Sequence, residues 1–196
     1  MIRIATPHDA AACHAIYAPI VEDSAITFET GLPGDDAMRE RIVARMQSYP
    51  WLVWEENGTV LAYAYCGRFR ERAAYDWIAE TSIYVHGNAR RRGIARRLYA
   101  TLLDVMNMQR INQAVGVITL PGETSVALHE SMGFTPAGIW RDAGYKLDRW
   151  WDVGVWQKTL HTPPAVPAPL IRFPELAGSP ELADLLAIGS AATRAP

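Results

Sequence analysis

The stretch "YVHGNARRRGIARRLY", residues 84–99, decides how the rest of the sequence is interpreted. Five arginines lie among the eight residues Arg90 to Arg97, with Gly93 in their midst. The preceding residues are typical of a strand ending at Val85, and the following ones predict a helix from near Arg91. The first amides of a helix lack intrahelical partners, and the helix dipole adds positive charge at that end. The stretch therefore predicts a phosphate-binding loop between a strand and a helix.

The composition of the chain is that of a globular protein. The chain has 196 residues, a formal charge of -2 and 49% hydrophobic residues, which suits a globular domain with a sizeable core. Without a net positive charge, nucleic-acid binding is not expected. No window reaches the ~20 apolar residues of a membrane span, and the first residues do not resemble a secretion signal. Cys13 and Cys66 are too few for a disulfide framework, so we expect buried, reduced thiols in a cytoplasmic protein.

Hydrophobic patterning predicts a mixed α/β domain over residues 1–160, with the order β-α-α-β-β-β-α-β-α-β-β. Asn57-Gly58 between two β-rich runs is a strong hairpin signal. Ile94, Leu98 and Leu102 form one apolar stripe of the helix that follows the arginine loop.

Residues 161–196 differ in composition from the rest. "HTPPAVPAPLIRFPELAGSP" is rich in proline, which excludes a long helix or a central strand there. We expect a C-terminal tail that is partly disordered or draped on the surface, with one short amphipathic turn in "ELADLLAIG". On this interpretation, removal of the tail would leave the fold intact.

Arg90-x-x-Gly93-x-Ala95 after a strand resembles the acetyl-CoA signature of the GCN5-related N-acetyltransferases (GNAT). Longer stretches resemble the phosphinothricin and methionine sulfoximine N-acetyltransferases of that superfamily, from about residue 2 to residue 160. They are "SYPWLVWEENG", "AYDWIAETSIYV", "ITLPGETSVALHESMGF" and "WWDVGVWQKTL". The resemblance implies the acyl-CoA N-acyltransferase fold, a central mixed β-sheet flanked by helices, and acetyl-CoA as co-substrate with no metal.

The resemblance also implies which residues contact acetyl-CoA. In such enzymes the backbone of the catalytic strand holds the pantetheine arm and the acetyl carbonyl, and the arginine loop holds the pyrophosphate. Gly122 stands where the family often has an asparagine that contacts the cofactor, so that contact is either missing or supplied by Glu123 or Ser125. The expected contacts are Ile83, Tyr84, Val85, Arg90, Arg91, Arg92, Gly93, Ile94, Ala95, Arg96, Gly122 and Ser125.

Two residues are candidates for proton transfer. Glu80 is the lone carboxylate in the otherwise uncharged strand from Trp77 to Val85, where burial without a purpose is expensive. By resemblance it matches the family's catalytic base, which deprotonates the amine before direct attack; the alternative is a structural ion pair with an arginine. His129 stands where the superfamily has a proton donor for the CoA thiolate, and the alternative is a backbone-bonded helix histidine.

The amine substrate has its own candidate residues. Arg70 and Arg72, in "GRFRERAAYDW", are candidates for a bidentate pair with a carboxylate. Three aromatic residues are candidates for the walls of the side-chain pocket, and the alternative for at least one of them is core packing. The expected acceptor site is Phe28, Arg70, Arg72, Tyr75 and Trp77. The late segment "YKLDRWWD", residues 145–152, carries tryptophans whose exposure would favour a homodimer.

The sequence thus favours an acetyl-CoA-dependent N-acetyltransferase acting on the α-amine of a small amino-acid analogue such as methionine sulfoximine, methionine sulfone or phosphinothricin. Two alternatives stay open. One is the same chemistry on another small amine or a protein N-terminus, although two arginines near the site disfavour a cationic acceptor. The other is a CoA-binding sensor without catalysis, which the presence of Glu80 disfavours.

Overall fold

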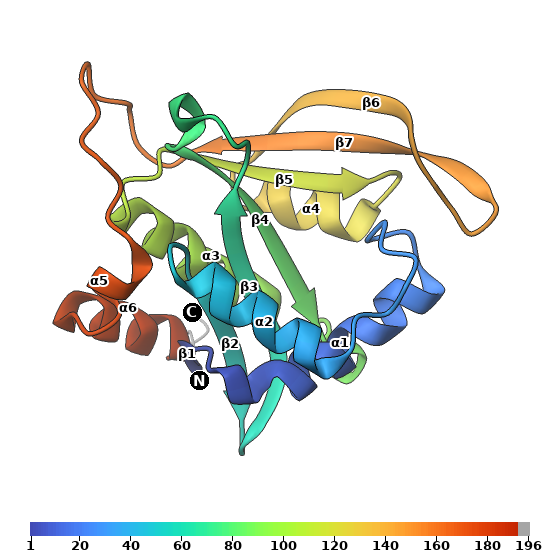
Figure 1. The fold of residues 1–196 in the computed structure, drawn as a ribbon, viewed down its shortest axis with the longest axis horizontal. Coiled ribbons are helices and arrows are strands. Elements are labelled where there is room, and N and C mark those ends of the chain that lie inside the picture. Colours follow the sequence, from blue (N-terminus) through green and yellow to red (C-terminus); the bar gives the residue numbers. More distant parts are fainter. Residues whose placement is uncertain (192–196) are drawn as a thin grey trace, which may run out of the picture.

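The computed structural model describes residues 1–191 and has one seven-stranded mixed sheet at its centre (Figure 1). The strand order is β1-β2-β3-β4-β5-β7-β6, and only β4 and β5 are parallel neighbours. The strands are β1 (Ile2–Ile4), β2 (Trp51–Glu56), β3 (Thr59–Arg68), β4 (Ile78–Val85), β5 (Gln113–Thr119), β6 (Thr135–Lys146) and β7 (Arg149–Thr159). The predicted order of elements and the mixed sheet are confirmed.

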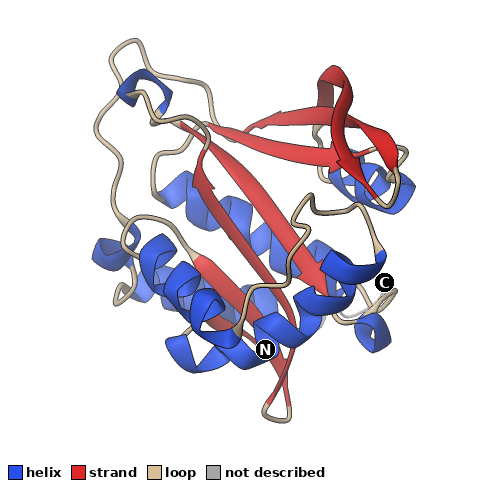
Figure 2. Ribbon diagram, turned by 45° about the vertical axis from the view of Figure 1, so that its right-hand side comes forward, coloured by secondary structure: helices blue, strands red, loops and turns tan. Residues whose placement is uncertain are grey.

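Helices cover both faces of this sheet (Figures 1 and 2). Residues of α1 and α2 form one core cluster with the side chains of one face of β2 and β3, and residues of α3 form the other. Because strand side chains alternate, Tyr63 faces α1 and α2 while Ala62 and Ala64 face α3. The helices are α1 (Ala10–Asp23), α2 (Asp35–Met46), α3 (Ile94–Met108), α4 (Glu123–Ser131), α5 (Phe173–Leu176) and α6 (Pro180–Ser190), with short 3₁₀ turns at Pro7–Asp9, Ala73–Tyr75 and Gly87–Ala89.

The sheet opens between β4 and β5. The two strands pair from Ile78–Gln113 to Thr81–Gly116, and no later pair joins them. Figure 1 shows both strands starting side by side and then running apart, with β5 continuing along β7 and β4 along β3. The sheet is therefore split into a V whose vertex lies at the Thr81–Gly116 pair.

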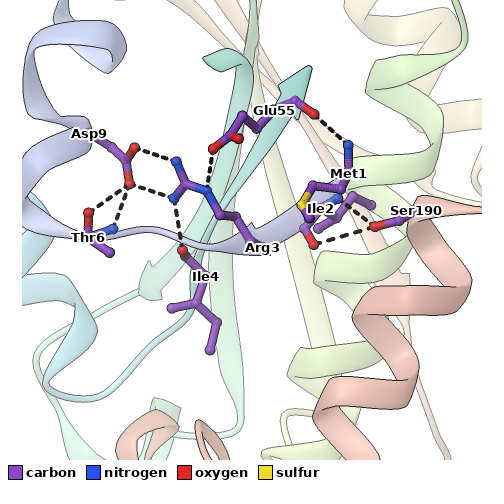
Figure 3. A network of polar contacts seen from close by, with 8 residues as sticks. All are labelled: Met1, Ile2, Arg3, Ile4, Thr6, Asp9, Glu55 and Ser190. Carbon is purple, nitrogen blue, oxygen red and sulfur yellow. Dashed lines mark hydrogen bonds and ion pairs between the residues drawn. The ribbon is translucent and has the colours of Figure 1, made fainter. Parts of the chain in front are cut away.

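The N-terminal edge strand is fixed by a polar network (Figure 3). The Arg3 guanidinium donates to both carboxylate oxygens of Asp9, at 2.7 and 2.8 Å, and to Glu55 at 2.6 Å. The amide of Ile2 donates to the hydroxyl of Ser190 at the end of α6. The end of the C-terminal helix therefore lies against the outer edge of β1. An edge strand that is covered in this way is protected from pairing with a strand of another chain.

The C-terminal tail is more than a chain draped over the surface. Residues up to 172 are extended and largely exposed, as the proline content predicts, but two helices follow. Phe173 and Leu182 are each 1% exposed and belong to the main core cluster with the α3 side chains. Arg97 of α3 donates to the carbonyl of Gly189 at 3.2 Å and to the next two carbonyls of α6. These contacts argue against the expectation that the tail is dispensable for folding.

Other expectations from composition can be compared with the described residues. Cys13 and Cys66 are both buried and free. Across residues 1–191, none of the helices has the length and apolar character needed to cross a membrane. The same residues contain no group of three or more His, Cys, Asp or Glu side chains that could hold a metal ion.

Candidate active site

Glu80 lies one residue before the vertex of the V, on the face of β4 that carries α1 and α2. It pairs across β3 with Gly67, and its side chain makes no hydrogen bond or ion pair within residues 1–191. Burial raises the pKa of this carboxyl, and the nearby charges of Arg70 and then Arg45 offset that rise only in part. An unpaired carboxylate with a raised pKa is suited to accept a proton, so the expected role as a base is compatible with its environment.

His129 lies at the same vertex on the opposite face of the sheet. Its Nδ1 is 2.7 Å from the carbonyl oxygen of Ser125, so Nδ1 carries the proton and donates. A Cβ atom added to Gly116 would lie 2.4 Å from Nε2, which places that nitrogen directly against β5 at the last pair of the V. The side chain also packs edge-on against Tyr99 and Phe134.

The protonation of His129 bears on its expected role as a proton donor. Burial lowers its pKa, and the hydrogen bond to the Ser125 carbonyl opposes this only in part. A neutral ring protonated at Nδ1 has a lone pair, and no proton, at Nε2. The expected proton donor therefore presents a hydrogen-bond acceptor at the vertex in its resting state.

The arginine loop is organised as a turn before the helix. Helix α3 begins at Ile94, later than the predicted Arg91, because Arg91 and Gly93 have left-handed backbones with φ of 61° and 77°. Gly93 is the N-cap and has no side chain to satisfy the first amides of α3. A Cβ at Gly93 would meet nothing within 4 Å, so the glycine is required by its backbone conformation, and the space beside it is open.

The arginines of the loop have different roles. Arg90 and Arg91 are exposed and make no hydrogen bond or ion pair within residues 1–191, which leaves their guanidinium groups available to an anion. Arg92 pairs with Glu56 at 2.7 Å, and Arg96 reaches the Ser131 carbonyl at 3.4 Å. Arg97 stacks over Trp54 and binds the end of α6, so it belongs to the tail interface.

The remaining expected cofactor positions divide between backbone and side chain. Ile83, Tyr84 and Val85 lie in the part of β4 that has diverged from β5, so their backbone is accessible to a ligand in the V. Ile94 is buried in the core and Ala95 is half-buried, so Ile94 can serve a ligand only through its amide.

Gly122 and Ser125 lie at the start of α4 and serve it structurally. Gly122 is the left-handed N-cap, with φ of 45°, and an added Cβ would lie 2.5 Å from the Thr119 carbonyl oxygen. The conformation of this turn therefore requires glycine at position 122, independently of any contact with a ligand. The Ser125 carbonyl holds His129, which links this helix turn to the vertex of the V.

The expected acceptor residues are not gathered in one place. Phe28 is in the loop between α1 and α2 and packs on Gly144 of β6, where a Cβ would come within 2.2 Å of its ring. Tyr75 lies in the β3–β4 connection against Phe69, and this connection is well separated from the α1–α2 loop in both ribbon views (Figures 1 and 2). Trp77 donates to the Ala168 carbonyl of the tail at 2.9 Å, so its ring packs toward the tail and does not share a pocket wall with Phe28.

Arg70 and Arg72 both lie in the β3–β4 connection and are exposed. Arg70 stacks on the neighbouring Phe69 ring, and its charge is the larger of the two that lower the pKa of Glu80. Arg72 makes no hydrogen bond or ion pair within residues 1–191. Both are compatible with a carboxylate contact near the base.

A cavity that the sequence did not predict lies between α2 and strands β2 and β3, on the Glu80 face of the sheet. It has a volume of about 510 Å³ and is here called the α2 cavity. Its floor is a stack of aromatic rings, with Trp51 and Tyr65 only 4.2 Å apart. Arg41 and Arg45 of α2 form its opposite side. In the sequence, Arg41 and Arg45 each come one residue before a member of the apolar stripe of α2, the buried Ile42 and the partly buried Met46. That position was the signal from which their place beside the core could have been predicted.

The β6–β7 hairpin exposes large apolar side chains at its tip. Tyr145, Leu147 and Trp150 are 55%, 51% and 60% exposed, and Ile139 and Trp140 of β6 are close to half exposed. Monomeric proteins rarely leave such a contiguous set of apolar side chains in water.

Known proteins resemble this chain over most of its length. Residues 2–155 match the model of the acetyltransferase (GNAT) domain family. The phosphinothricin N-acetyltransferase of Streptomyces viridochromogenes is 40% identical over 169 residues, covering 86% of this chain and 92% of the relative. The L-methionine sulfoximine/L-methionine sulfone acetyltransferase of Salmonella typhimurium is 31% identical and covers 81% and 94%.

A solved structure agrees with these relatives. The phosphinothricin acetyltransferase of Sinorhizobium meliloti, in complex with acetyl-CoA, superposes with a TM-score of 0.82 at 30% identity over 89% of this chain and 96% of that one. The split sheet, the arginine loop before α3 and the matched family model together show that this chain belongs to the GNAT acetyltransferase family.

Proposed function

We propose that this acetyltransferase transfers the acetyl group of acetyl-CoA to the α-amine of a small amino-acid analogue of the methionine sulfone, methionine sulfoximine or phosphinothricin type. The observation that carries the proposal is Glu80, a half-buried carboxylate without a partner in residues 1–191, at the vertex of a split sheet. The names of the two relatives described above support this acceptor class.

Acetyl-CoA supplies the acetyl group as an activated thioester. The open face of Gly93, the free amides at the start of α3 and the unpaired guanidinium groups of Arg90 and Arg91 fit its pyrophosphate. The diverged backbone of β4 from Ile83 to Val85 lies along the V that would hold the pantetheine arm.

Glu80 accepts the proton of the substrate ammonium, because an aliphatic amine is mostly protonated at neutral pH and only the free amine attacks. A raised pKa makes the ionised carboxylate a better base than an exposed glutamate. The role of His129 as proton donor to the CoA thiolate stays a prediction. Its Nε2 lies at the vertex but must first take up a proton, which burial of the ring opposes.

The arginine loop gives the first prediction. Arg91→Ala should raise the dissociation constant of acetyl-CoA about tenfold or more, because a hydrogen bond to a charged group is lost. Gly93→Val should weaken binding as well, since a β-branched residue is strained at a φ of 77°. Calorimetry on folded protein measures both, with Arg39→Ala on the exposed face of α2 as the control. Wild-type affinity in both loop variants would show that the arginine loop does not bind the pyrophosphate.

Arg72 gives the second prediction. Arg72→Ala should raise the KM of the amino-acid acceptor about tenfold and leave the KM of acetyl-CoA unchanged, because the guanidinium has no partner in residues 1–191 to lose. Arg70→Ala is the companion variant, since Arg70 has the larger of the two nearby charges that lower the pKa of Glu80. Equal acceptor KM values in wild type and both variants would show that these arginines do not hold the carboxylate.

A panel of acceptors tests the proposed function. Purified protein with acetyl-CoA is assayed for thiol release with methionine sulfone, methionine sulfoximine, phosphinothricin, spermidine and a peptide with a free N-terminus. We expect release with the three amino acids. Release with spermidine or the peptide alone would replace the acceptor class, and binding of acetyl-CoA without any transfer would favour a sensor.

We further propose that the enzyme is a homodimer formed through the β6–β7 hairpin. The exposed Tyr145, Leu147 and Trp150 at its tip support this, since a second copy would cover them. Sedimentation should show a dimer for wild type and a monomer for the double variant Tyr145→Glu, Trp150→Glu. A wild-type monomer at micromolar concentration would exclude the dimer.

A further inference from the structure

The α2 cavity contains one arginine that differs from its neighbours. Arg41 is held by both carboxylate oxygens of Glu29, at 2.7 and 3.2 Å, and Arg68 is paired with Asp76 at 2.7 Å. Arg45 is half-buried and makes no hydrogen bond or ion pair within residues 1–191. Its N–H groups have lost part of their hydration without gaining a hydrogen-bond acceptor, which is unfavourable unless a ligand supplies acceptor oxygens.

The position of Arg45 relates it directly to the base. Its guanidinium lies over the Tyr65 ring, 5.3 Å from the centroid. A Cβ added to Gly67 would come within 1.7 Å of Nη1, so only glycine leaves room for this guanidinium on the sheet. Gly67 is the cross-strand partner of Glu80, and therefore Arg45 lies between the base and the interior of the cavity.

The two sides of Glu80 offer different environments for a small amino acid. On the outer side, the β3–β4 connection brings the exposed Arg70 and Arg72. On the inner side, a cavity of about 510 Å³ has an aromatic floor that suits methylene groups, with Arg45 at its edge. That volume is in the usual range for a small-molecule pocket. An amino acid whose amine is held at Glu80 would then have its carboxylate on the side of Arg70 and Arg72 and its side chain in the α2 cavity.

We propose that Arg45 recognises the oxygen-bearing head at the end of the acceptor's side chain, the sulfone, sulfoximine or phosphinate group, and so determines specificity within the α2 cavity. This inference rests on the proposed function. The planar fork of an arginine donates two parallel hydrogen bonds, which two oxygens on one sulfur or phosphorus atom can accept. Acceptors that lack these oxygens gain nothing from Arg45 and leave it partly desolvated.

The test compares acceptors within one variant. Methionine sulfone and methionine share the amine, the carboxylate and the carbon chain, and differ in the two oxygens on sulfur. Arg45→Met keeps an unbranched, largely apolar side chain at this position while removing the guanidinium fork. Because Arg45 is also one of the charges that lower the pKa of Glu80, comparing acceptors in the same variant cancels any change in the base. Arg39→Ala on the same helix, in an exposed pair with Asp36, is the matched control.

In the wild type, kcat/KM should favour methionine sulfone over methionine. In Arg45→Met this preference should fall about tenfold, with a loss for phosphinothricin of about 10- to 100-fold because its head is charged. Arg45→Lys should keep part of the activity on phosphinothricin and lose the preference for the sulfone. The affinity for acetyl-CoA should not change in any variant.

Two results would overturn the assignment. An equal loss on all three acceptors would show that Arg45 holds the shared carboxylate or acts only through Glu80. An unchanged preference in an active variant would show that Arg45 contacts no part of the head, while the proposed function would stand. If the wild type acetylated none of the three amino acids, both the proposed function and this inference would be wrong.

Discussion

Replacing Glu80 by glutamine should lower kcat by about 10²- to 10⁴-fold at neutral pH, the usual contribution of a general base. The amide keeps the size of the side chain but cannot accept the proton of the ammonium. The affinity for acetyl-CoA should be unchanged, because the arginine loop lies beyond the far end of β4. Rapid quench and steady-state thiol release measure the first effect, and calorimetry the second.

The same variant should be more stable than the wild type. Burial raises the pKa of Glu80 in the folded protein, so at pH values above that pKa the ionised carboxylate opposes folding. The neutral glutamine removes this unfavourable contribution, and the Tm at pH 7 should rise. Wild-type kcat across pH 6 to 9, or a fall in Tm, would show that Glu80 has a structural role.

The pH dependence of the wild type follows from the same shift. Protonated Glu80 cannot act as a base, so kcat/KM should fall as the pH decreases through a pKa that lies above the ~4.3 of an exposed glutamate. The titration of Glu80 should be absent from the profile of Glu80→Gln, whose residual rate should fall steadily with decreasing pH as the free amine becomes protonated.

Replacing Phe173 by alanine should destabilise the protein by about 3–5 kcal/mol, the range for deleting a buried phenylalanine ring. Phe173 is 1% exposed and lies in the main core cluster, although it belongs to the tail. The expected measurement is the free energy of unfolding in urea. Val166→Ala is the matched control, because Val166 lies in the same tail at 85% exposure and should change stability by less than about 0.5 kcal/mol.

Equal stability of Phe173→Ala and the wild type would mean that the tail does not pack on α3 in solution. Removal of residues 162–196 should then also be harmless, as expected from a family resemblance that ends before them. The buried Leu182 and the contacts of Arg97 with α6 predict the opposite.

The sequence predicted what depends on local patterns. The order of elements followed from hydrophobic periodicity and from Asn57-Gly58, where both residues have positive φ as a two-residue hairpin turn requires. The arginine loop was recognised because a strand, a glycine and a helix lie in one short stretch. Glu80 stood out as the only charge in its strand.

What the sequence could not give depends on long-range packing. Periodicity places Arg45 beside the buried stripe of its helix, but it does not show that the side chain lies over Gly67, 22 residues later in the sequence. Trp77 lies near Glu80 in sequence, yet it contacts Ala168 in the tail because neighbouring side chains of a strand face opposite sides. The tautomer of His129 depends on a hydrogen bond to Ser125 that no motif encodes.

The most direct measurement is identification of the product by mass spectrometry after incubation of the purified chain with acetyl-CoA and methionine sulfone. We predict a methionine sulfone one acetyl group heavier, with the acetyl group on the α-nitrogen, formed at least about 10²-fold more slowly by Glu80→Gln. No acetylated amino acid from a protein that binds acetyl-CoA, or equal rates for both proteins, would contradict catalysis by Glu80 at the vertex of the split sheet.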